Sequence, residues 1–410
     1  MENAKVSFYV TDEKFEIPFT TVSSFTLYSS IHSSYPFGEI VLDDPEGKYL
    51  TYLGIKPGNI INIVATPIFE IDDPLVISKS KEVYVTPMRV VSLKNPDVNE
   101  TDGKISSLGG KVTLNIAHPW AIFSDYSNRS FSKKCSQIIR EVIQQGNNKR
   151  GFKFEALSID DSDDTGAVVR YKLGESEAKF IHSKVLPYTT INKMPAYSFI
   201  DEIGVFHLHN FKKMYDQTPL MLLIPPIREG FGGLLTDADA SKSIHQLLNG
   251  SWDIGSEFKN QFGNFKKTVY VESSSDRVTF LAQMPYYPSI PGYVLVQNSL
   301  IEDVSAASGS ITSNILPFRD FEDAIRLDVN SNSIMDEFFQ IKVTTTLAID
   351  VVQVGSPIEL RLMGEPYATD SKKTHWANGK WLVTRAKHFS IDGKYYSTLA
   401  LAKPAFPSLP

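Results

Sequence analysis

The stretch QIKVTTTLAIDVVQVGSPIELRLM, residues Gln340–Met363, alternates apolar with polar positions and is rich in β-branched residues. The pieces GKWLVTRAKHFS, at Gly379–Ser390, and GKYYSTLALAKP, at Gly393–Pro404, follow with the same character. A period of two and an excess of β-branched and aromatic side chains are typical of half-buried strands. The turn sequences Gly355-Ser356-Pro357 and Asp392-Gly393 separate the pieces. This part of the chain therefore predicts a small antiparallel β module.

The same pattern of three strand-like segments occurs near the N-terminus, in LGIKPGNIINIVATP (Leu53–Pro67), KEVYVTPMRVVSL (Lys81–Leu93) and GGKVTLNIAHP (Gly109–Pro119). In both copies a Gly/Pro turn precedes an alternating strand, at Pro57-Gly58-Asn59 and at Gly355-Ser356-Pro357. In both copies the third strand begins with Gly-Lys and closes on Pro. We interpret this pattern as a diverged internal duplication of one antiparallel β domain.

We therefore expect a mainly β fold with α+β insertions, in which each chain carries two similar antiparallel β-barrel domains. The expected domains are a first β-barrel at 1–119, an α+β insertion at 120–215, an irregular connecting region at 216–264, a second β-barrel at 265–404 that a loop and helix at 286–339 interrupt, and a tail at 405–410.

Between the two copies the period changes, and local elements are predicted from it. Apolar residues at helical spacing predict a helix over Cys135–Gln145 that Gly146-Asn147-Asn148 ends. The other predictions are a helix or the approach to a strand at Pro195–Val205, a strand at Val205–Phe211, a short helix at Ser241–Asn249, a hairpin of Lys266–Ser273 with Arg277–Met284, and a helix at Phe318–Asp328.

Composition excludes several classes of protein. The chain has 410 residues and a net charge of −6, which does not indicate a basic protein that grips nucleic acid. A single cysteine, Cys135, excludes an intramolecular disulfide and cysteine-cluster zinc sites. The start lacks the basic and apolar regions of a signal peptide, and no window approaches 18 uninterrupted apolar residues. We expect a soluble protein made in a cytoplasm.

The block Phe318–Pro404 resembles the C-terminal half of the baseplate hub protein of T-even-like tailed bacteriophages, a family related to the spike-base module of contractile injection systems. The resemblance is carried by Glu322–Leu327, by Gly355 with Ile358-Glu359-Leu360, by Val383–Phe389 and by Thr398–Leu401. Weaker similarities lie upstream in the expected order, at Cys135–Ile143 after Arg129-Ser130-Phe131 and at Ser198–Val205 before Phe206–Phe211.

The resemblance implies a homotrimer at the centre of a virion tail baseplate, assembled in the host cytoplasm. It implies two β-barrels per subunit, hence a ring of six that meets the six-fold tail tube protein on one side and a three-fold central spike protein on the other. Other baseplate or tail-tip proteins are further implied partners, and DNA would pass through the channel without specific binding. The family has no catalytic activity. The internal duplication fits independently, because a trimer with two equivalent modules per chain meets a hexameric ring with near-equal contacts.

Two other functions stay open at this point. The spike-base protein of a contractile secretion system shares the fold but usually continues into a spike domain, and the end of this chain at Pro410 favours a phage hub. A tail-associated hydrolase that degrades cell wall or polysaccharide would need a catalytic pair within 120–317.

Two motifs suggest metal ions. His207-Leu208-His209 places two imidazoles on one face of a strand, and the alternative is the polar face of that strand. The loop Asp161–Gly166 resembles the first half of a calcium loop, but Lys172 stands where a bidentate glutamate belongs. We favour an ordinary acidic surface loop.

The remaining candidates are weaker. Gly230–Gly233 lacks the Lys-Ser/Thr of a phosphate loop, no nucleophile elbow is present, and Cys135 lies on the apolar face of its helix. Glu141 with Glu155 has no supporting glycosidase pattern. We therefore expect no enzyme and no cofactor, and name no catalytic, cofactor-binding or metal-binding residue. Scattered basic pairs are interpreted as solvated ends or contacts to acidic neighbours: Lys133-Lys134, Lys149-Arg150, Lys212-Lys213, Lys266-Lys267 and Lys372-Lys373.

Overall fold

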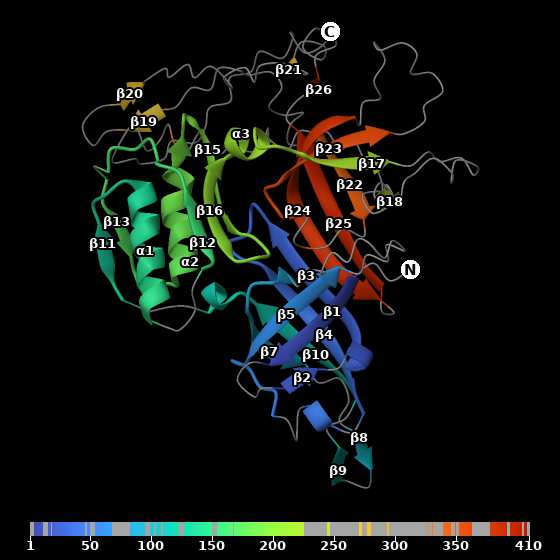
Figure 1. Cartoon of the computed structure of the whole chain (residues 1–410). Helices are drawn as coiled ribbons and strands as arrows, with labels where there is room; N and C mark the ends of the chain where they lie inside the picture. The colour runs from blue at the N-terminus through green and yellow to red at the C-terminus, as the bar shows by residue number, and fades with distance from the viewer. Residues whose placement is uncertain are drawn as a thin grey trace, which may run out of the picture.

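The structure is a computed structural model (Figure 1). It describes residues 4–10, 15–17, 19–45, 47–49, 54–67, 83–94, 99–101, 104–107, 110–122, 127–149, 154–166, 168–224, 244–246, 270–272, 277–279, 293–294, 326, 330, 339–345, 349, 352–362, 378–391, 394–403 and 406–407. Within these residues the protein is mainly β, as the sequence predicts, with a few helices between two groups of strands.

The N-terminal strands form the blue half of one large sheet (Figure 1). Their order in the sheet is β2-β1-β5-β7-β10-β4-β3, with all neighbours antiparallel and β6 added beside β5. The strands are β1 (Ala4–Val10), β2 (Phe15–Ile17), β3 (Val22–Ser30), β4 (Phe37–Asp44), β5 (Ile60–Pro67), β6 (Val83–Tyr84), β7 (Met88–Lys94) and β10 (Gly110–Ala117). A separate hairpin joins β8 (Asn99–Thr101) to β9 (Lys104–Ser107).

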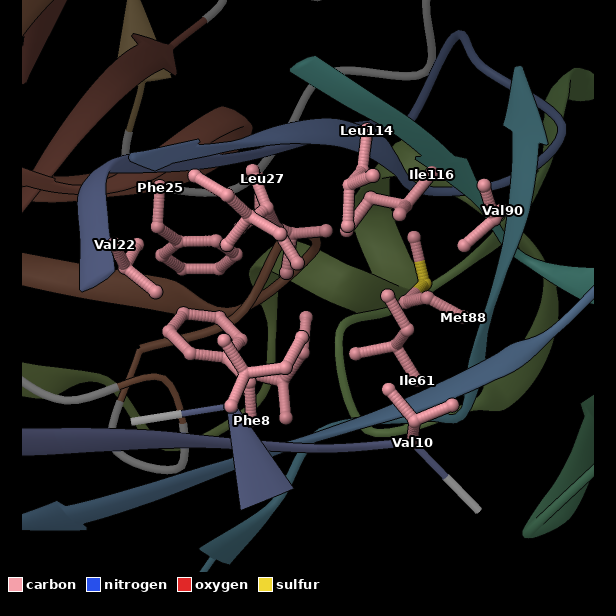
Figure 2. Close-up of a cluster of buried hydrophobic side chains, with 14 of the residues drawn as sticks. Phe8, Val10, Val22, Phe25, Leu27, Ile61, Met88, Val90, Leu114 and Ile116 are labelled. Carbon is pink, nitrogen blue, oxygen red and sulfur yellow. The ribbon is translucent and has the colours of Figure 1, made fainter. Parts of the chain in front are cut away.

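Alternate residues of these strands point inward and form one apolar core (Figure 2). Phe8 of β1 and Phe25 of β3 meet edge to face with ring centroids 5.2 Å apart, although their strands lie far apart in the sheet order. The sheet therefore curls until its ends face each other across the core. Its pairings remain open among the described strands, because no hydrogen-bonded ladder joins β3 to β1 or β2. The expected closed barrel is replaced by a curled open sheet.

The C-terminal strands continue the same sheet in the order β18-β22-β25-β24, and β24 then pairs with β3. They are β18 (Ile244–Gln246), β22 (Phe339–Thr345), β23 (Pro357–Leu362), β24 (Gly379–Ile391) and β25 (Lys394–Lys403). β23 pairs antiparallel with the start of β24 and, on its other side, parallel with β17 (Leu220–Ile224). The two groups of strands are thus joined into one sheet, where the sequence predicts two separate barrels.

The middle of the chain forms an α+β unit beside the large sheet (Figure 1). Helix α1 (Cys135–Lys149) and the short α2 (Glu177–Phe180) share a core with a four-stranded sheet of order β12-β16-β15-β14. Its strands are β12 (Ala156–Ile159), β14 (Thr190–Ile191), β15 (Met194–Ile200) and β16 (Val205–Asn210), while β11 (Arg129–Phe131) pairs with β13 (Arg170–Lys172) and α3 (Phe211–Tyr215) follows β16.

Several local predictions are confirmed and others are wrong. The helix at Cys135 forms, but it continues through Gly146-Asn147-Asn148 to Lys149. Pro195–Val205 contains the strand β15 rather than a helix, because every residue of β15 is buried. Ser241–Asn249 contains the strand β18, since pairing with β22 overrides the helical spacing of its apolar residues. The predicted hairpin is present as β19 (Tyr270–Glu272) and β20 (Arg277–Thr279).

Other predictions lie outside the described residues. These are Gly230–Gly233 and most of Phe318–Asp328, of which the structure describes only Arg326 as helical. The two short strands β21 (Tyr293–Val294) and β26 (Phe406–Pro407) pair with each other near the C-terminus. In the described part of the chain, no helix is long and apolar enough to cross a membrane.

Candidate assembly interface

Two sets of five strands share one topology. The first module comprises β3, β4, β5, β7 and β10, and the second module comprises β18, β22, β23, β24 and β25, each in chain order. The spatial order is β3-β4-β10-β7-β5 in the first module and β18-β22-β25-β24-β23 in the second, with every pair antiparallel. In both modules, the strands numbered along the chain lie side by side in the order first, second, fifth, fourth, third. The duplication inferred from sequence is therefore visible in the strand pairing.

The irregularities of the two modules also coincide. The ladder between β7 and β10 skips Val91, and the ladder between β24 and β25 skips Thr384. A second shift falls after Val22 in the β3–β4 ladder and after Ile244 in the β18–β22 ladder. A β-bulge bends and twists its strand, so matched bulges give the two sheets matched curvature.

The turn before the third strand of each module is built identically. Gly58 and Gly355 both adopt positive φ, at 101° and 83°. Each donates its N–H to a carbonyl of the fourth strand of its module, Gly58 to Val90 of β7 and Gly355 to Val383 of β24, at 2.8 Å in both cases. Val90 and Val383 donate back to Asn59 and Ser356, at 2.9 and 3.0 Å. Glycine is needed here because side chains disfavour this backbone conformation.

Strand β24 joins the modules, because its two halves serve different partners. Its first half, Gly379–Leu382, pairs with β23 of its own module. Its second half, Arg385–Ile391, pairs with Ser30–Ser24 of β3 in the first module. On its opposite edge the strand pairs with β25 from Leu382 to Ile391. We call the pairing of β24 with β3 the intrachain junction.

The turn between β15 and β16 of the α+β unit carries Glu202, which lies at this junction and contacts both modules. The carbonyl oxygen of Glu202 accepts a hydrogen bond from the N–H of Thr86, at 2.9 Å. One carboxylate oxygen of Glu202 accepts from the hydroxyl of Ser29 on β3, and the other accepts from the N–H of Val354, at 3.2 Å. The ring of His388 on β24 lies 3.3 Å from the same carboxylate. One glutamate thus binds residues of both modules at once.

The Glu202 network continues into the second module and is buried throughout. Nδ1 of His388 lies 2.7 Å from the Ser397 hydroxyl and 2.8 Å from the Tyr395 hydroxyl. Burial opposes the charge of Glu202, but hydrogen bonds from His388 and Ser29 outweigh it, and the pKa of Glu202 is lowered. Because Glu202, His388 and Ser397 are each 0% exposed, no substrate can reach them. The arrangement positions the modules rather than performing catalysis.

The two histidines singled out in the sequence have neighbouring rings, with centroids 5.6 Å apart, but they form hydrogen bonds to different partners. His207 Nε2 is 2.8 Å from a carboxylate oxygen of Asp201. His209 uses both ring nitrogens, with Nδ1 2.8 Å from Asp160 and Nε2 2.9 Å from the Ser158 hydroxyl. Burial lowers the pKa of His209, so its neutral form is favoured. Each ring is bound to neighbours within the chain, and the described residues contain no group of three or more potential metal ligands.

The hydroxyl of Ser158, the ring of His209 and the carboxylate of Asp160 are hydrogen-bonded in series, as in the catalytic triad of a serine hydrolase. Lys213 also binds Asp160, and the hydrogen bonds from Lys213 and His209 lower the pKa of Asp160 despite its partial burial. In α/β-hydrolases the nucleophile stands on a sharp strand-to-helix turn, and serine hydrolases supply hydrogen-bond donors for the oxyanion. Ser158 instead lies within β12, in register with His207 of the parallel strand β16. The geometry supplies a hydrogen-bond chain that ties β12 to β16.

The acidic loop predicted from sequence has a structural role. Both carboxylate oxygens of Asp164 accept from the N–H of Cys135, at 3.1 and 2.9 Å, at the first turn of α1. Asp163 accepts from the N–H groups of Asn192 and Lys193, at 3.1 and 2.7 Å, in a turn where both have positive φ. A carboxylate at a helix N-terminus satisfies donors that the helix leaves open and complements its dipole. The buried Asp164 therefore caps α1, while Asp161 and Asp163 of the same loop are exposed, as the surface-loop prediction expects.

Asp164→Ala is expected to lower the free energy of unfolding by about 1–2 kcal/mol, because the cap of α1 is lost. Chemical denaturation of the full chain measures the effect. Asp161→Ala is the matched control, since the exposed Asp161 pairs with Arg140 at 2.7 Å in a surface ion pair and should change stability by less than about 0.5 kcal/mol. Equal effects of the two substitutions would contradict the capping role.

The other sequence candidates are distributed over the α+β unit. Cys135 is buried, and burial raises the pKa of its thiol to about 11, which makes it a core residue rather than a nucleophile. Lys172, at the missing calcium-ligand position, is buried against Glu177 at 3.3 Å. Glu141 binds Lys133 at 2.6 Å. Among the basic pairs, Lys212 and Lys213 also bind carboxylates within the chain, those of Asp216 and Asp160.

The residues of the Glu202 network were not singled out in the sequence. The sequence contained a signal, because Tyr395, Ser397, Leu399 and Leu401 alternate and therefore share one face of a strand. The structure shows that all four are buried. Hydroxyl groups on an apolar face need polar partners. The sequence does not reveal that the partner is Glu202, which comes from a different unit of the fold.

The chain was compared with known proteins. No protein-family model and no curated protein sequence matches it. Among solved structures, a tail protein from Neisseria meningitidis is similar at a TM-score of 0.52 and 10% identity, covering 98% of this chain and 97% of that one. The 43 kDa tail protein of prophage MuSo2 from Shewanella oneidensis is similar at a TM-score of 0.51 and 10% identity, covering 100% of both chains. The similarity extends over the whole chain and shows a shared fold.

Proposed function

We propose that this chain, which has the fold of phage tail proteins, is the structural hub of a tail baseplate or tail tip. In this proposal three copies form a homotrimer that joins the six-fold tail tube to a three-fold central spike and surrounds the DNA exit channel. Other baseplate or tail-tip proteins bind around it. The domain that contains the first module is assigned to residues 1–119 and the α+β unit to 120–215. The domain that contains most of the second module is assigned to 265–404, with β18 contributed from the preceding region 216–264.

The observation that supports the proposal is the repeated module. Three identical chains have three-fold symmetry, so a six-fold partner would meet each subunit at two positions. Equal contacts at both positions need two equivalent surfaces in each chain. The matched strand order, matched bulges and matched turns of the two modules supply such a pair. The negative net charge of −6 suits a channel that DNA passes without tight binding.

The oligomeric state tests the proposal directly. Sedimentation velocity on the full chain should give a species of three times the 45.9 kDa subunit mass, alone or after addition of its tube or spike partner. Reconstruction of the assembled tail should place six modules in one ring. A stable monomer that stays monomeric with both partners would contradict the hub. A spike-base protein of a contractile secretion system shares the fold, and the particle that contains the chain distinguishes the two.

The Ser158–His209–Asp160 chain motivates one test from another class, a cell-wall or polysaccharide hydrolase. We expect the wild-type protein to release no product from peptidoglycan and no nitrophenol from nitrophenyl acetate, because Ser158 lies within strand β12 and not on the strand-to-helix turn of a nucleophile elbow. Measurement beside Ser158→Ala gives the background rate. A wild-type rate above background that Ser158→Ala abolishes would establish a hydrolase.

A further inference from the structure

A ring of three chains contains a second kind of junction, and the intrachain junction predicts how it is made. Within one chain, β24 of the second module pairs with β3 of the first. Ring closure also needs the first module of one subunit to meet the second module of the next. In the matched topology, β7 is the equivalent of β24, and β18 is the equivalent of β3. This inference rests on the proposed trimer and specifies its contact surface.

Part of the β5-facing edge of β7 has no described backbone pairing. On the side facing β5, the ladder covers only Arg89 and Met88, and Val90 exchanges two hydrogen bonds with the turn at Gly58 and Asn59. Beyond Val90, the described pairing of β7 is with β10 alone. The equivalent part of β24 pairs on both sides, with β25 and with β3.

Exposure of the bulged residue shows the same difference. Val91 is 46% exposed, although it is a large apolar side chain in a strand. Its equivalent in the second module, Thr384, is 1% exposed, and its carbonyl accepts the N–H of Ile31 at 3.0 Å. Thr384 lies where β24 passes from β23 to β3, and its backbone is bonded to Ile31, which follows β3. An open strand edge with an exposed apolar residue is a liability for uncontrolled pairing unless a specific partner covers it.

We propose that the edge of β7 from Val91 to Lys94 pairs antiparallel with the β18 edge of the second module of a neighbouring copy. The interchain junction then repeats the intrachain one, with β7 in the role of β24 and β18 in the role of β3. The described residues of β18 pair with β22, as β3 pairs with β4. Strand β17 lies near β18 without a described ladder to it, so the second edge of β18 carries no described backbone pairing. A continuous sheet through all six modules results.

The test uses three variants of the full chain. Val91→Asp places an uncompensated charge in the proposed junction and should raise the concentration for half-maximal trimer formation by roughly a hundredfold. Val91→Thr introduces the residue found at the equivalent position and should assemble like wild type. Val169→Asp makes the same change at an apolar residue that is 39% exposed on the α+β unit, and it should also leave assembly unchanged. Thermal unfolding confirms that all three fold.

Sedimentation velocity and hydrogen exchange give separate readouts. The amides of Val91–Lys94 should be protected in the wild-type trimer and exchange faster in the Val91→Asp monomer. A trimer that Val91→Asp leaves intact, with fast exchange in β7, would overturn this junction while the hub stands. Fast exchange of β7 in a wild-type trimer that has already formed, with protection only once a tube or spike partner is then added, would assign the edge to that partner and also overturn the junction. A wild-type chain that never forms trimers removes the hub and the junction together.

Discussion

Glu202→Ala is expected to lower the free energy of unfolding by about 3–5 kcal/mol, because it breaks a fully buried charged network. The substitution leaves His388, Ser29 and the N–H of Val354 without the acceptor that they share. Loss of one partner from a buried pair costs more than loss of a surface pair, since the remaining groups stay desolvated. Chemical denaturation of the monomeric full chain measures the change.

Two controls accompany Glu202→Ala. Glu141→Ala removes a half-exposed ion pair with Lys133 and should cost less than about 1 kcal/mol. Glu202→Gln keeps the shape and tests the charge. The pKa of Glu202 lies below its ordinary value of 4.5, so its charge stabilises the fold above that pH. As the pH falls through the folded pKa this contribution is lost, and the difference between wild type and Glu202→Gln should shrink. A difference that does not change between pH 7 and pH 3 would refute the assignment.

Gly355→Ala is expected to destabilise the protein by about 3–5 kcal/mol, and Gly58→Ala by only about 1–2 kcal/mol. Both glycines adopt positive φ in the same turn of their modules, so the backbone strain of an added methyl group is alike. A Cβ at Gly355 would lie 2.7 Å from the ring of Phe199, whereas a Cβ at Gly58 would meet nothing within 4 Å. The difference between the two variants therefore measures the packing of the α+β unit on the second module.

Equilibrium unfolding of the two glycine variants isolates that packing term. Phe199→Leu combined with Gly355→Ala should recover part of the lost stability, because the smaller side chain makes room for the methyl group. Phe199→Leu alone is the matched control, since it removes ring contacts from the buried cluster around Phe199 and Met214. Equal destabilisation by Gly355→Ala and Gly58→Ala would show that backbone strain alone decides the cost.

The duplication could be predicted from sequence because it rests on local signals. Turn residues before β5 and β23 and alternation along β24 and β25 are properties of contiguous residues. The alignment of the third strands is less accurate. Next to the matched bulges, Asn115 lies opposite Ser92 and Ala400 lies opposite Arg385, so Asn115 and Ala400 are equivalent positions. Counting back from them, Gly110-Lys111 does not align with Gly393-Lys394, so the Gly-Lys pairs that begin these strands in the sequence are not equivalent. The closing Pro119 and Pro404 keep the correct register.

The junction could not be predicted, because it depends on contacts between distant residues. Alternation in β24 marks a strand, but its length does not show that its second half leaves its own module for β3. Likewise the helical spacing of Ile244 with its neighbours predicted a helix, and only the edge of β22 makes this segment a strand. The capping role of Asp164 could not be predicted, because its helix partner, at Cys135, lies on an earlier segment.

The pairing of β24 with β3 has a consequence for how the protein is made. The segment Ser24–Ser30 is synthesised long before its partner segment Arg385–Ile391. The joint between the modules can therefore close only after Arg385–Ile391 has been made. Chains that stop early present an uncovered β3 edge and lack the strand that shapes the neighbouring module. Chains that end before β24 therefore cannot form the joint between the modules.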